Sequence, residues 1–514
     1  MVKGTEIKKI ARGAGILLLN GFVLYAIRFI YRIITSRYLG PEDYGLLSLG
    51  VMVAGMFAFL SPIGTNTGIT KFVAHYNGLK DKERIKGTII SVLKISFIIS
   101  IIASMILILF SSSIAVNIFH NISFKPILIV FAISIPFWTL IQIVGKTLIA
   151  FKKPEYMVIS STFGRELSLL LIVGSIILFG GTLIHISIAF IIALIIGVVI
   201  GFFLLEKKVF PLIRGKIKYV TQYKELISFS FPLFLSTFFI NIMSWIDTFF
   251  LGYFTNLTSV GIYNVALPLA SSIVLFLGSF SKMFFPIISE IHAKKSEEDV
   301  SKIFIVIARW IFMLSFPIFI FFILFPKSII NLFFGHAYLE GHMALVILVI
   351  GYFVQVITGP SIEVLKTYEK VKIIFYINTS VAIMNVVLNI VLIPIYGMLG
   401  AAISTTLALV VRELFIVYHV KRLIGFKYPF PLYIKYFISG IVPIPLVFIV
   451  FNLTKILHPL LQMIILFCMF FTLYIGLLLI QKGLTKDDKI ILLAVENKFG
   501  LKLGFVKKLL NKLI

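Results

Sequence analysis

Long apolar runs, separated by short polar stretches, follow one another along nearly the whole 514-residue chain. The hydrocarbon core of a bilayer takes about 20 consecutive apolar residues per helix, whereas a barrel strand would alternate apolar and polar positions over about ten residues. The predicted helical spans lie near 13–36, 43–70, 87–111, 126–150, 157–179, 183–205, 226–252, 260–287, 303–325, 341–364, 373–395, 398–420, 433–452 and 459–481. The pattern therefore predicts an all-α membrane protein with about 14 transmembrane helices.

Composition agrees with this prediction, because 60% of the residues are hydrophobic and only 13% are charged. Ordinary soluble domains carry about 25% charged residues. A chain this apolar has too little polar surface to coat a water-soluble globule, and it is too hydrophobic to stay disordered. A soluble enzyme is therefore excluded. The single cysteine, Cys468, also excludes an intrachain disulfide and a metal site built from cysteines.

The 47 Lys and Arg residues outnumber the 21 Asp and Glu residues, which gives a net charge of +26. In a soluble protein this excess would suggest a nucleic-acid partner, but in a membrane protein basic loops mark the cytoplasmic side. With the N-terminus placed inside, 34 of the 47 fall in inside segments, 4 in outside loops and 9 within spans. This asymmetry predicts a multi-pass protein of the cytoplasmic membrane with both termini in the cytoplasm, and no nucleic-acid partner.

The chain also resembles itself at an offset of about 216 residues. The matched positions are Leu39-Gly40 with Leu251-Gly252, Tyr44-Gly45 with Val260-Gly261, Lys86 with Lys302, Phe151-Lys-Lys with Tyr368-Glu-Lys, and Gly180 with Gly397. Each repeat contains six spans, and an even number means that both repeats run the same way through the membrane. A parallel repeat of this kind builds two bundles around a central cavity, which is typical of transporters that work by alternating access.

The repeat predicts four segments. They are a six-helix lobe over 1–217, a second six-helix lobe over 218–424, two additional transmembrane helices within 425–481, and a tail over 482–514. In the tail, apolar and Lys residues alternate at helical spacing. This pattern is typical of a basic amphipathic helix on the cytoplasmic leaflet, with a solvated tail as the alternative.

The most specific stretch is RYLGPEDYGLLSL at 37–49, directly after the first span. With six plus six spans and a two-span addition, it resembles the polysaccharide transporter (Wzx-type) flippases of the multidrug/oligosaccharidyl-lipid/polysaccharide (MOP) superfamily, relatives of the lipid II flippases. The resemblance implies a V-shaped, MATE-like fold that moves an undecaprenyl- or dolichyl-linked oligosaccharide. It further implies a lipid-linked glycan and membrane lipids as partners, and a monomer that works with polysaccharide-assembly proteins.

Arg28 and Arg32 lie four residues apart on one face of the first span. An ionised side chain in hydrocarbon is costly, so it usually faces a cavity or a partner. At about 1.5 Å per residue, Arg28 lies about 22 Å from the inner end, in the outer half of the membrane. A guanidinium suits a diphosphate oxyanion, so we expect both arginines to bind substrate. The alternative is that they snorkel to the outer surface.

Four further basic residues lie about six to eight residues in from the cytoplasmic ends of their spans. They are Lys94, Arg165, Arg309 and Arg412. We expect a cationic vestibule for an incoming lipid diphosphate, with snorkelling toward the anionic inner leaflet as the alternative. Glu166 and Glu413 each follow an arginine, and adjacent residues do not face each other on a helix, so neither is expected to form an intrahelical pair. Glu363 and Lys366, three apart, should form a local ion pair.

Asp247 is an isolated carboxylate near the outer end of the seventh span. Together with Asn385, Asn389 and Thr405 it looks like the sodium site of lipid II flippases, although Asn389 stands where that resemblance expects a second carboxylate. Oxygen ligands suit a hard cation such as Na⁺, and H⁺ is the other candidate coupling ion. The alternatives are a salt bridge of Asp247 that closes an outer gate, and ordinary polar helix contacts worth about 0.6 kcal/mol each.

The main alternative function is a cation-coupled multidrug exporter of the same superfamily. Its cationic substrates would be repelled by the first six spans, whose charged residues are mostly basic. A membrane polymerase or glycosyltransferase would need a catalytic domain outside the bilayer, and the outside loops near 112–125 and 326–340 are too short for one. Gly145-Lys146-Thr147 resembles the end of a P-loop but lies within a span. We therefore expect a flippase, not an enzyme, that needs no cofactor beyond a coupling ion.

Overall fold

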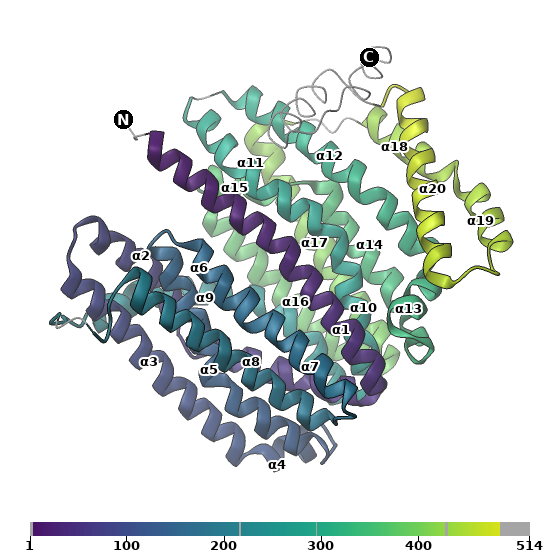
Figure 1. The fold of residues 1–514 in the computed structure, drawn as a ribbon. Coiled ribbons are helices and arrows are strands. Elements are labelled where there is room, and N and C mark those ends of the chain that lie inside the picture. The colour runs from purple at the N-terminus through teal and green to yellow at the C-terminus, as the bar shows by residue number, and fades with distance from the viewer. Residues whose placement is uncertain (1–3, 215–216, 295, 427–429, 484–514) are drawn as a thin grey trace. The chain divides into compact units, whose positions relative to one another are not determined.

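The computed structural model describes residues 4–214, 217–294, 296–426 and 430–483, and every regular element in these ranges is a helix (Figure 1). The first elements are α1 (Gly4–Leu60), α2 (Thr65–Gly78), α3 (Lys82–Leu109), α4 (Ser111–Ser113), η1 (Ile114–Ile118), α5 (Phe124–Ala150), α6 (Pro154–Val158), η2 (Ile159–Leu167), α7 (Ser168–Leu178), α8 (Leu183–Leu204), η3 (Leu205–Val209) and α9 (Tyr223–Phe254). They are followed by α10 (Leu257–Ser271), η4 (Ser272–Val274), α11 (Leu275–Ala293), α12 (Glu297–Leu324), α13 (Pro326–Phe334), η5 (His336–Gly341), α14 (His342–Thr358), α15 (Ser361–Thr367), α16 (Val371–Tyr396), α17 (Met398–Ile424), α18 (Phe430–Ile441), α19 (Ile444–Leu453) and α20 (Pro459–Ile480). The all-α prediction is confirmed.

Among the described residues, 12 helices are long and apolar enough to cross a membrane. The count becomes 13 when the two halves of α9, which are bent by 43° between Leu235 and Thr237, are taken as one span. The protein is therefore a multi-pass membrane protein, and the predicted number of 14 is approximate. The predicted amphipathic tail lies outside the described residues, apart from its first two positions.

The break within α1 accounts for the difference in count. Residues Leu19–Leu60 count as one helix of 42 residues, which at about 1.5 Å per residue would be about 63 Å long, twice the thickness of a bilayer core. Gly40 interrupts this helix with φ 76° and ψ 174°, and Pro41 follows it. A positive φ strains any residue with a Cβ, so glycine suits this position. The break falls between the predicted spans 13–36 and 43–70.

By their internal contacts the residues form two compact units, Met1–Val265 with Asn389–Met398, and Ala266–Leu388 with Leu399–Ile514. In the first unit α5 lies between α3 and α8, and α1 packs against α5 (Figure 1). Apolar side chains of α2, α3, α5 and α9 form one of its hydrophobic clusters, which includes Ile69, Val73, Ile89, Val92, Leu148 and Leu226. The lobe boundaries predicted at 217 and 424 follow the repeat and stay a prediction.

In the second unit, aromatic side chains of α12 join four helices. The ring of Phe312 lies 5.3 Å from that of Phe353 on α14 and 5.8 Å from that of Tyr436 on α18, measured between centroids. Phe316, one turn further along α12, lies 6.1 Å from Tyr474 on α20. The predicted additional helices of segment 425–481 therefore pack against the second unit through buried rings, an arrangement that adds to the hydrophobic contribution of each ring.

The internal repeat is visible in the helix boundaries. α3 and α12 are each 28 residues long, and their first and last residues are 215 apart. The turns after the repeated spans also match. Lys152 and Glu369, 217 residues apart, both have positive φ (59° and 56°), and so do Gly180 and Gly397 (72° and 55°). Non-glycine residues seldom adopt positive φ, so a shared value at equivalent positions supports the repeat.

One close contact within the first unit maps onto itself under this repeat. A Cβ added to Gly45 of α1 would overlap the carbonyl oxygen of Leu257, and a Cβ added to Gly261 of α10 would overlap the carbonyl oxygen of Pro41. An offset of 216 converts Pro41 into Leu257 and Gly45 into Gly261. The contact is therefore reciprocal, as in an interface between two-fold related copies. Small residues of this kind let helix backbones approach closely in membranes.

We expect Gly45→Ala and Gly261→Ala each to lower the stability of the purified protein, by about 1–3 kcal/mol, because the added methyl group pushes two backbones apart. Thermal unfolding in detergent measures this effect. Gly174→Ala is the matched control, since a Cβ at Gly174 of α7 would meet no atom within 4 Å. The double variant should lose less than the sum of the single losses, because both changes act on one contact. Equal melting temperatures for the Gly45 and Gly174 variants would contradict the close contact.

Candidate functional site

In the first unit, a buried carboxylate joins two arginines. Arg28 of α1 donates from Nη2 and Nε to Oε1 of Glu166 in η2, over 2.6 and 3.1 Å. Nη1 of Arg165 lies 3.4 Å from the same oxygen. The Glu166 side chain is 8% exposed, that of Arg165 12% and that of Arg28 50%. Two guanidinium groups therefore share one carboxylate, which leaves the cluster with a net positive charge.

Aromatic side chains surround the buried member of this pair. The Arg165 guanidinium lies 4.9 Å from the ring centroid of Trp138 on α5 and 5.3 Å from that of Phe190 on α8. Rings at these distances attract a cation through their negative faces. Nε of Arg165 is buried and has no hydrogen-bond partner within the described part of the chain. Arg165 is thus held by packing and charge, and its capacity to donate hydrogen bonds is not fully used.

The structure corrects the depth predicted for these residues. The sequence placed Arg28 in the outer half of the membrane and Arg165 in an inner vestibule, yet both contact Glu166. The helix that carries Arg165 begins at Pro154, earlier than the predicted span, so Arg165 lies about 17 Å along it at 1.5 Å per residue. It runs through nine π-helical residues, Ile159–Leu167. Such wider turns occur mostly at functional sites.

The expectation that adjacent Arg and Glu residues form no pair was wrong. Arg412 Nη1 donates to Glu413 Oε1 over 2.8 Å, and Arg165 contacts Glu166. Neighbouring positions point about 100° apart on a helix, but the arginine side chain is long enough to reach around. In the second unit Arg412 also donates to Asn378 over 3.0 Å, and Thr358 donates to Glu413 over 2.8 Å. This network joins α14, α16 and α17.

The remaining predicted basic residues lie in different surroundings. Arg32 is half-buried on α1, and Lys94 of α3 is exposed, with Nζ 5.9 Å from the ring centroid of Tyr219. Arg309 of α12 is 4% exposed and belongs to the second unit. The structure therefore brings Arg28 and Arg165 together, while the substrate roles of all six basic residues stay predictions. The predicted pair of Glu363 and Lys366 is confirmed, with 3.0 Å between Oε1 and Nζ.

Asp247 of α9 lies in a second buried polar cluster of the first unit. Its Oδ2 accepts a hydrogen bond from the Tyr263 hydroxyl of α10 over 2.6 Å, and its Oδ1 accepts one from Nδ2 of Asn389 on α16 over 2.8 Å. Asp247 is 3% exposed, and the other two are fully buried. The predicted pairing of Asp247 with Asn389 is thus present. Asn385, one turn before Asn389, and Thr405 of α17 are also buried, but both belong to the second unit.

These side chains can be tested against the chemistry of a coupling ion. Within the described residues, no group of three or more His, Cys, Asp or Glu side chains could hold a metal ion. A divalent-ion site rich in carboxylates is therefore not among the described residues, whereas a single carboxylate with neutral oxygen groups matches the charge of Na⁺ or H⁺. Asn389 directs its amide nitrogen toward Asp247. Its amide would need to turn to offer oxygen to a cation.

Sequence reasoning missed Tyr263, although a signal was available. Asp247 lies eight residues before the turn at Thr255, and Tyr263 lies eight residues after it. In a helical hairpin, residues equally far from the turn lie at the same depth. Thr248 and Asn264, one position further along each helix, also form a hydrogen bond, over 3.2 Å. The aromatic partners of Arg165 gave no such signal, because they lie on helices distant in sequence.

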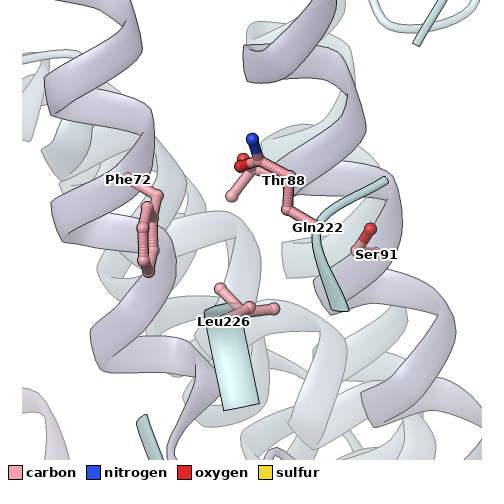
Figure 2. A pocket seen from close by; sticks show the side chains of 5 residues that line it. All are labelled: Phe72, Thr88, Ser91, Gln222 and Leu226. Atoms are coloured by element: carbon pink, nitrogen blue, oxygen red, sulfur yellow. The ribbon is translucent and has the colours of Figure 1, made fainter. Parts of the chain in front are cut away.

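A small pocket in the first unit is a poor candidate for the substrate site. It encloses about 160 Å³ and is lined by Phe72, Thr88, Ser91, Gln222 and Leu226. Figure 2 shows these side chains on neighbouring segments around the gap. Oγ of Ser91 and Oε1 of Gln222 are buried, with no hydrogen-bond partner among the described residues. The space is far too small for a lipid-linked oligosaccharide, so the charged clusters remain the stronger candidates.

Comparison with known families decides the class of protein. The family model described as polysaccharide biosynthesis protein matches residues 10–292, more than half of the chain. The chain belongs to the polysaccharide biosynthesis protein family. A second model, described as MatE, matches residues 232–391. The predicted resemblance to polysaccharide transporters of the MOP superfamily is thereby confirmed.

Similar proteins agree with this assignment. An uncharacterized membrane protein of Methanocaldococcus jannaschii is 24% identical over 472 residues, which cover 86% of this chain and 90% of that protein. A probable low-salt glycan biosynthesis flippase of Haloferax volcanii is 24% identical over 190 residues, covering 36% of this chain and 40% of the flippase. The inward closed structure of the lipid II flippase MurJ matches 89% of this family member and 98% of its own chain, with a TM-score of 0.70 and 18% identity. The predicted fold is confirmed, and these named neighbours are flippases rather than enzymes.

In this polysaccharide biosynthesis family member, we expect Arg165→Ala to destabilise the folded state more than Arg28→Ala. Removing Arg165 leaves a buried carboxylate beside an empty aromatic site, which costs about 3–5 kcal/mol. Removing the half-exposed Arg28 should cost about 1 kcal/mol or less. Thermal unfolding of the two purified variants in one detergent compares them. The reverse order of stability would show that Arg28, and not Arg165, compensates the charge of Glu166.

Proposed function

We propose that this protein moves a polyprenyl-(di)phosphate-linked oligosaccharide across the cytoplasmic membrane by alternating access. The proposal fits its family, the flippase named in Haloferax volcanii and the likeness to MurJ. One observation carries it further than the fold alone: Arg28 and Arg165, on two membrane-spanning helices, converge on one buried carboxylate. Membrane helices rarely hold charged side chains without a functional reason.

The arginine pair has the chemistry that a diphosphate needs. A guanidinium donates two parallel hydrogen bonds to a phosphate or carboxylate and keeps its charge at any physiological pH. Arg28 already binds an oxyanion, the carboxylate of Glu166, and half of its side chain surface remains accessible. We assign Arg32, Lys94, Arg309 and Arg412 to the same substrate path.

We also propose how the protein is oriented and coupled. The 34 basic residues assigned to inside segments, against 4 outside, support cytoplasmic termini. Asp247, with Asn385, Asn389 and Thr405, would bind Na⁺ or take up H⁺ as the coupling ion. A single buried carboxylate compensates one such charge. The protein would act as a monomer alongside polysaccharide-assembly proteins.

The alternative is a cation-coupled multidrug exporter, and one observation favours it. The MatE model matches residues 232–391, which include Asp247 and Asn389. A buried carboxylate could bind a cationic drug. The positive charge around Arg28 and Arg165 argues against this substrate class, because it would repel a cation in the first unit.

We expect the double variant Arg28→Ala, Arg32→Ala to lose flipping of a fluorescent polyprenyl-diphosphate oligosaccharide in proteoliposomes, because its diphosphate would lose two cationic partners. Removing charged hydrogen bonds worth about 1.5–3 kcal/mol each should slow flipping at least tenfold. Arg84→Ala is the matched control. Arg84 is also 50% exposed and lies 3.5 Å from a carboxylate oxygen, that of Asp81, but outside the proposed path.

The same liposomes distinguish the two functions. Wild-type protein that flips no lipid-linked glycan but exports a cationic dye down an ion gradient would replace the flippase proposal with the exporter.

We expect Asp247→Asn to abolish any dependence of flipping on an ion gradient, since the variant has no charge to compensate. Flipping is measured with a Na⁺ gradient, a pH gradient and no gradient. Tyr263→Phe, which removes one hydrogen bond to Asp247 but keeps the charge, should retain the dependence. Unchanged gradient dependence in Asp247→Asn would exclude Asp247 as the coupling group.

A further inference from the structure

Glu166 has a role that the substrate path alone does not explain. Both hydrogen bonds from Arg28 and the ion pair from Arg165 converge on one of its oxygens, Oε1. The two arginines are therefore not waiting in an open site. They are already bound to an anion that belongs to the protein itself.

We propose that Glu166 acts as an internal substitute for the substrate phosphate, which Arg28 exchanges for the substrate during transport. This inference rests on the proposed function. A carboxylate and a phosphate oxyanion offer the same acceptor chemistry to a guanidinium. Arg28 cannot give its strongest hydrogen bonds to both at once. Glu166 thus sets how tightly the diphosphate binds and how readily it leaves.

The burial of the three residues assigns a different part to each arginine. Arg28 is half exposed, so an incoming anion can reach its guanidinium. Arg165 is 12% exposed and held between Trp138 and Phe190, so it stays beside Glu166. When Arg28 turns to the substrate, Arg165 continues to compensate the carboxylate. The exchange therefore leaves no buried charge without a partner, a condition that would otherwise be costly.

A second contact keeps the helices in place during this exchange. Thr162 of η2, one turn before Glu166, donates to Oδ1 of Asn20 on α1 over 2.7 Å. Asn20 lies two turns before Arg28 on the same helix. Because this neutral hydrogen bond does not involve the arginines, α1 and η2 remain joined while the Arg28 side chain moves. Glu166 is in this sense a positioning residue that acts through Arg28.

The test uses a change whose sign separates this role from a structural one. The full chain in detergent is titrated with a fluorescent polyprenyl diphosphate, and polyprenol without phosphate serves as the reference ligand. Glu166→Gln should bind the diphosphate about tenfold more tightly than wild type, because Arg28 is freed from a charged hydrogen bond. Its flipping should be slower, since release is slower. A merely structural glutamate would give weaker binding and a lower melting temperature.

Three controls complete the design. Glu290→Gln removes a carboxylate that is 73% exposed and paired with Lys294, so it tests the effect of net charge and should leave binding unchanged. Arg28→Ala combined with Glu166→Gln should lose the gain, because Arg28 delivers it. Glu166→Asp keeps the charge but withdraws it by one methylene, and it should give a smaller gain. This last variant decides the question if Glu166→Gln does not fold.

Each outcome has a separate meaning. Equal or weaker diphosphate binding by folded Glu166→Gln, with wild type still preferring diphosphate to polyprenol, overturns the role of Glu166 and leaves the flippase proposal intact. A gain in binding that persists after Arg28→Ala is added also overturns the exchange between Glu166 and the substrate. Wild-type protein that binds diphosphate no better than polyprenol overturns the proposed function itself.

Discussion

A charge inside a membrane needs a partner, and the arrangement of helices in this protein follows from that requirement. Water cannot solvate an ionised side chain in hydrocarbon, so the protein must supply the opposite charge or hydrogen bonds. Glu166 joins α1 to η2 through Arg28, Glu413 joins α17 to α14 through Thr358, and Asp247 joins α9 to α10 and α16. Each acid thus determines which helices lie together, and each keeps a different degree of contact with cations. Glu166 has two arginines, Glu413 has one, and the two hydrogen bonds described for Asp247 come from neutral groups.

Close packing adds a second kind of constraint, which acts on the backbone. Apolar side chains cannot distinguish one helix face from another in lipid, because lipid tails are as apolar as leucine. Small residues at Gly45 and Gly261 do distinguish them, since only there can two backbones touch. The charged clusters and the glycine contact are complementary, because the former select partners by chemistry and the latter selects them by shape.

The spans could be predicted from the sequence because hydrophobicity is a local property. Most predicted spans lie within a few residues of a helix, and the merged count at α1 arises from Gly40, a residue within the predicted break at 39–45. The partners of charged residues could not be predicted, because they depend on which helices meet. Arg28 and Glu166 are 138 residues apart. The true start of a helix also changes the depth of every residue on it, which is why Arg165 was placed too near the cytoplasm. Local pairs such as Glu363 and Lys366 were predictable, since helical spacing alone brings them together.

The reciprocal contact at Gly45 and Gly261 has a geometric consequence. A contact that the repeat converts into itself must straddle the axis that relates the two copies. Points near a rotation axis travel least when the copies turn, while points far from it travel in proportion to their radius. The backbone atoms of Pro41, Gly45, Leu257 and Gly261 therefore form a fulcrum that stays closed through any motion that keeps the two copies equivalent. Small rotations there become large displacements at the remote ends of helices that are about 40 Å long, by the rise of an α-helix over the 28 residues of α3 and α12.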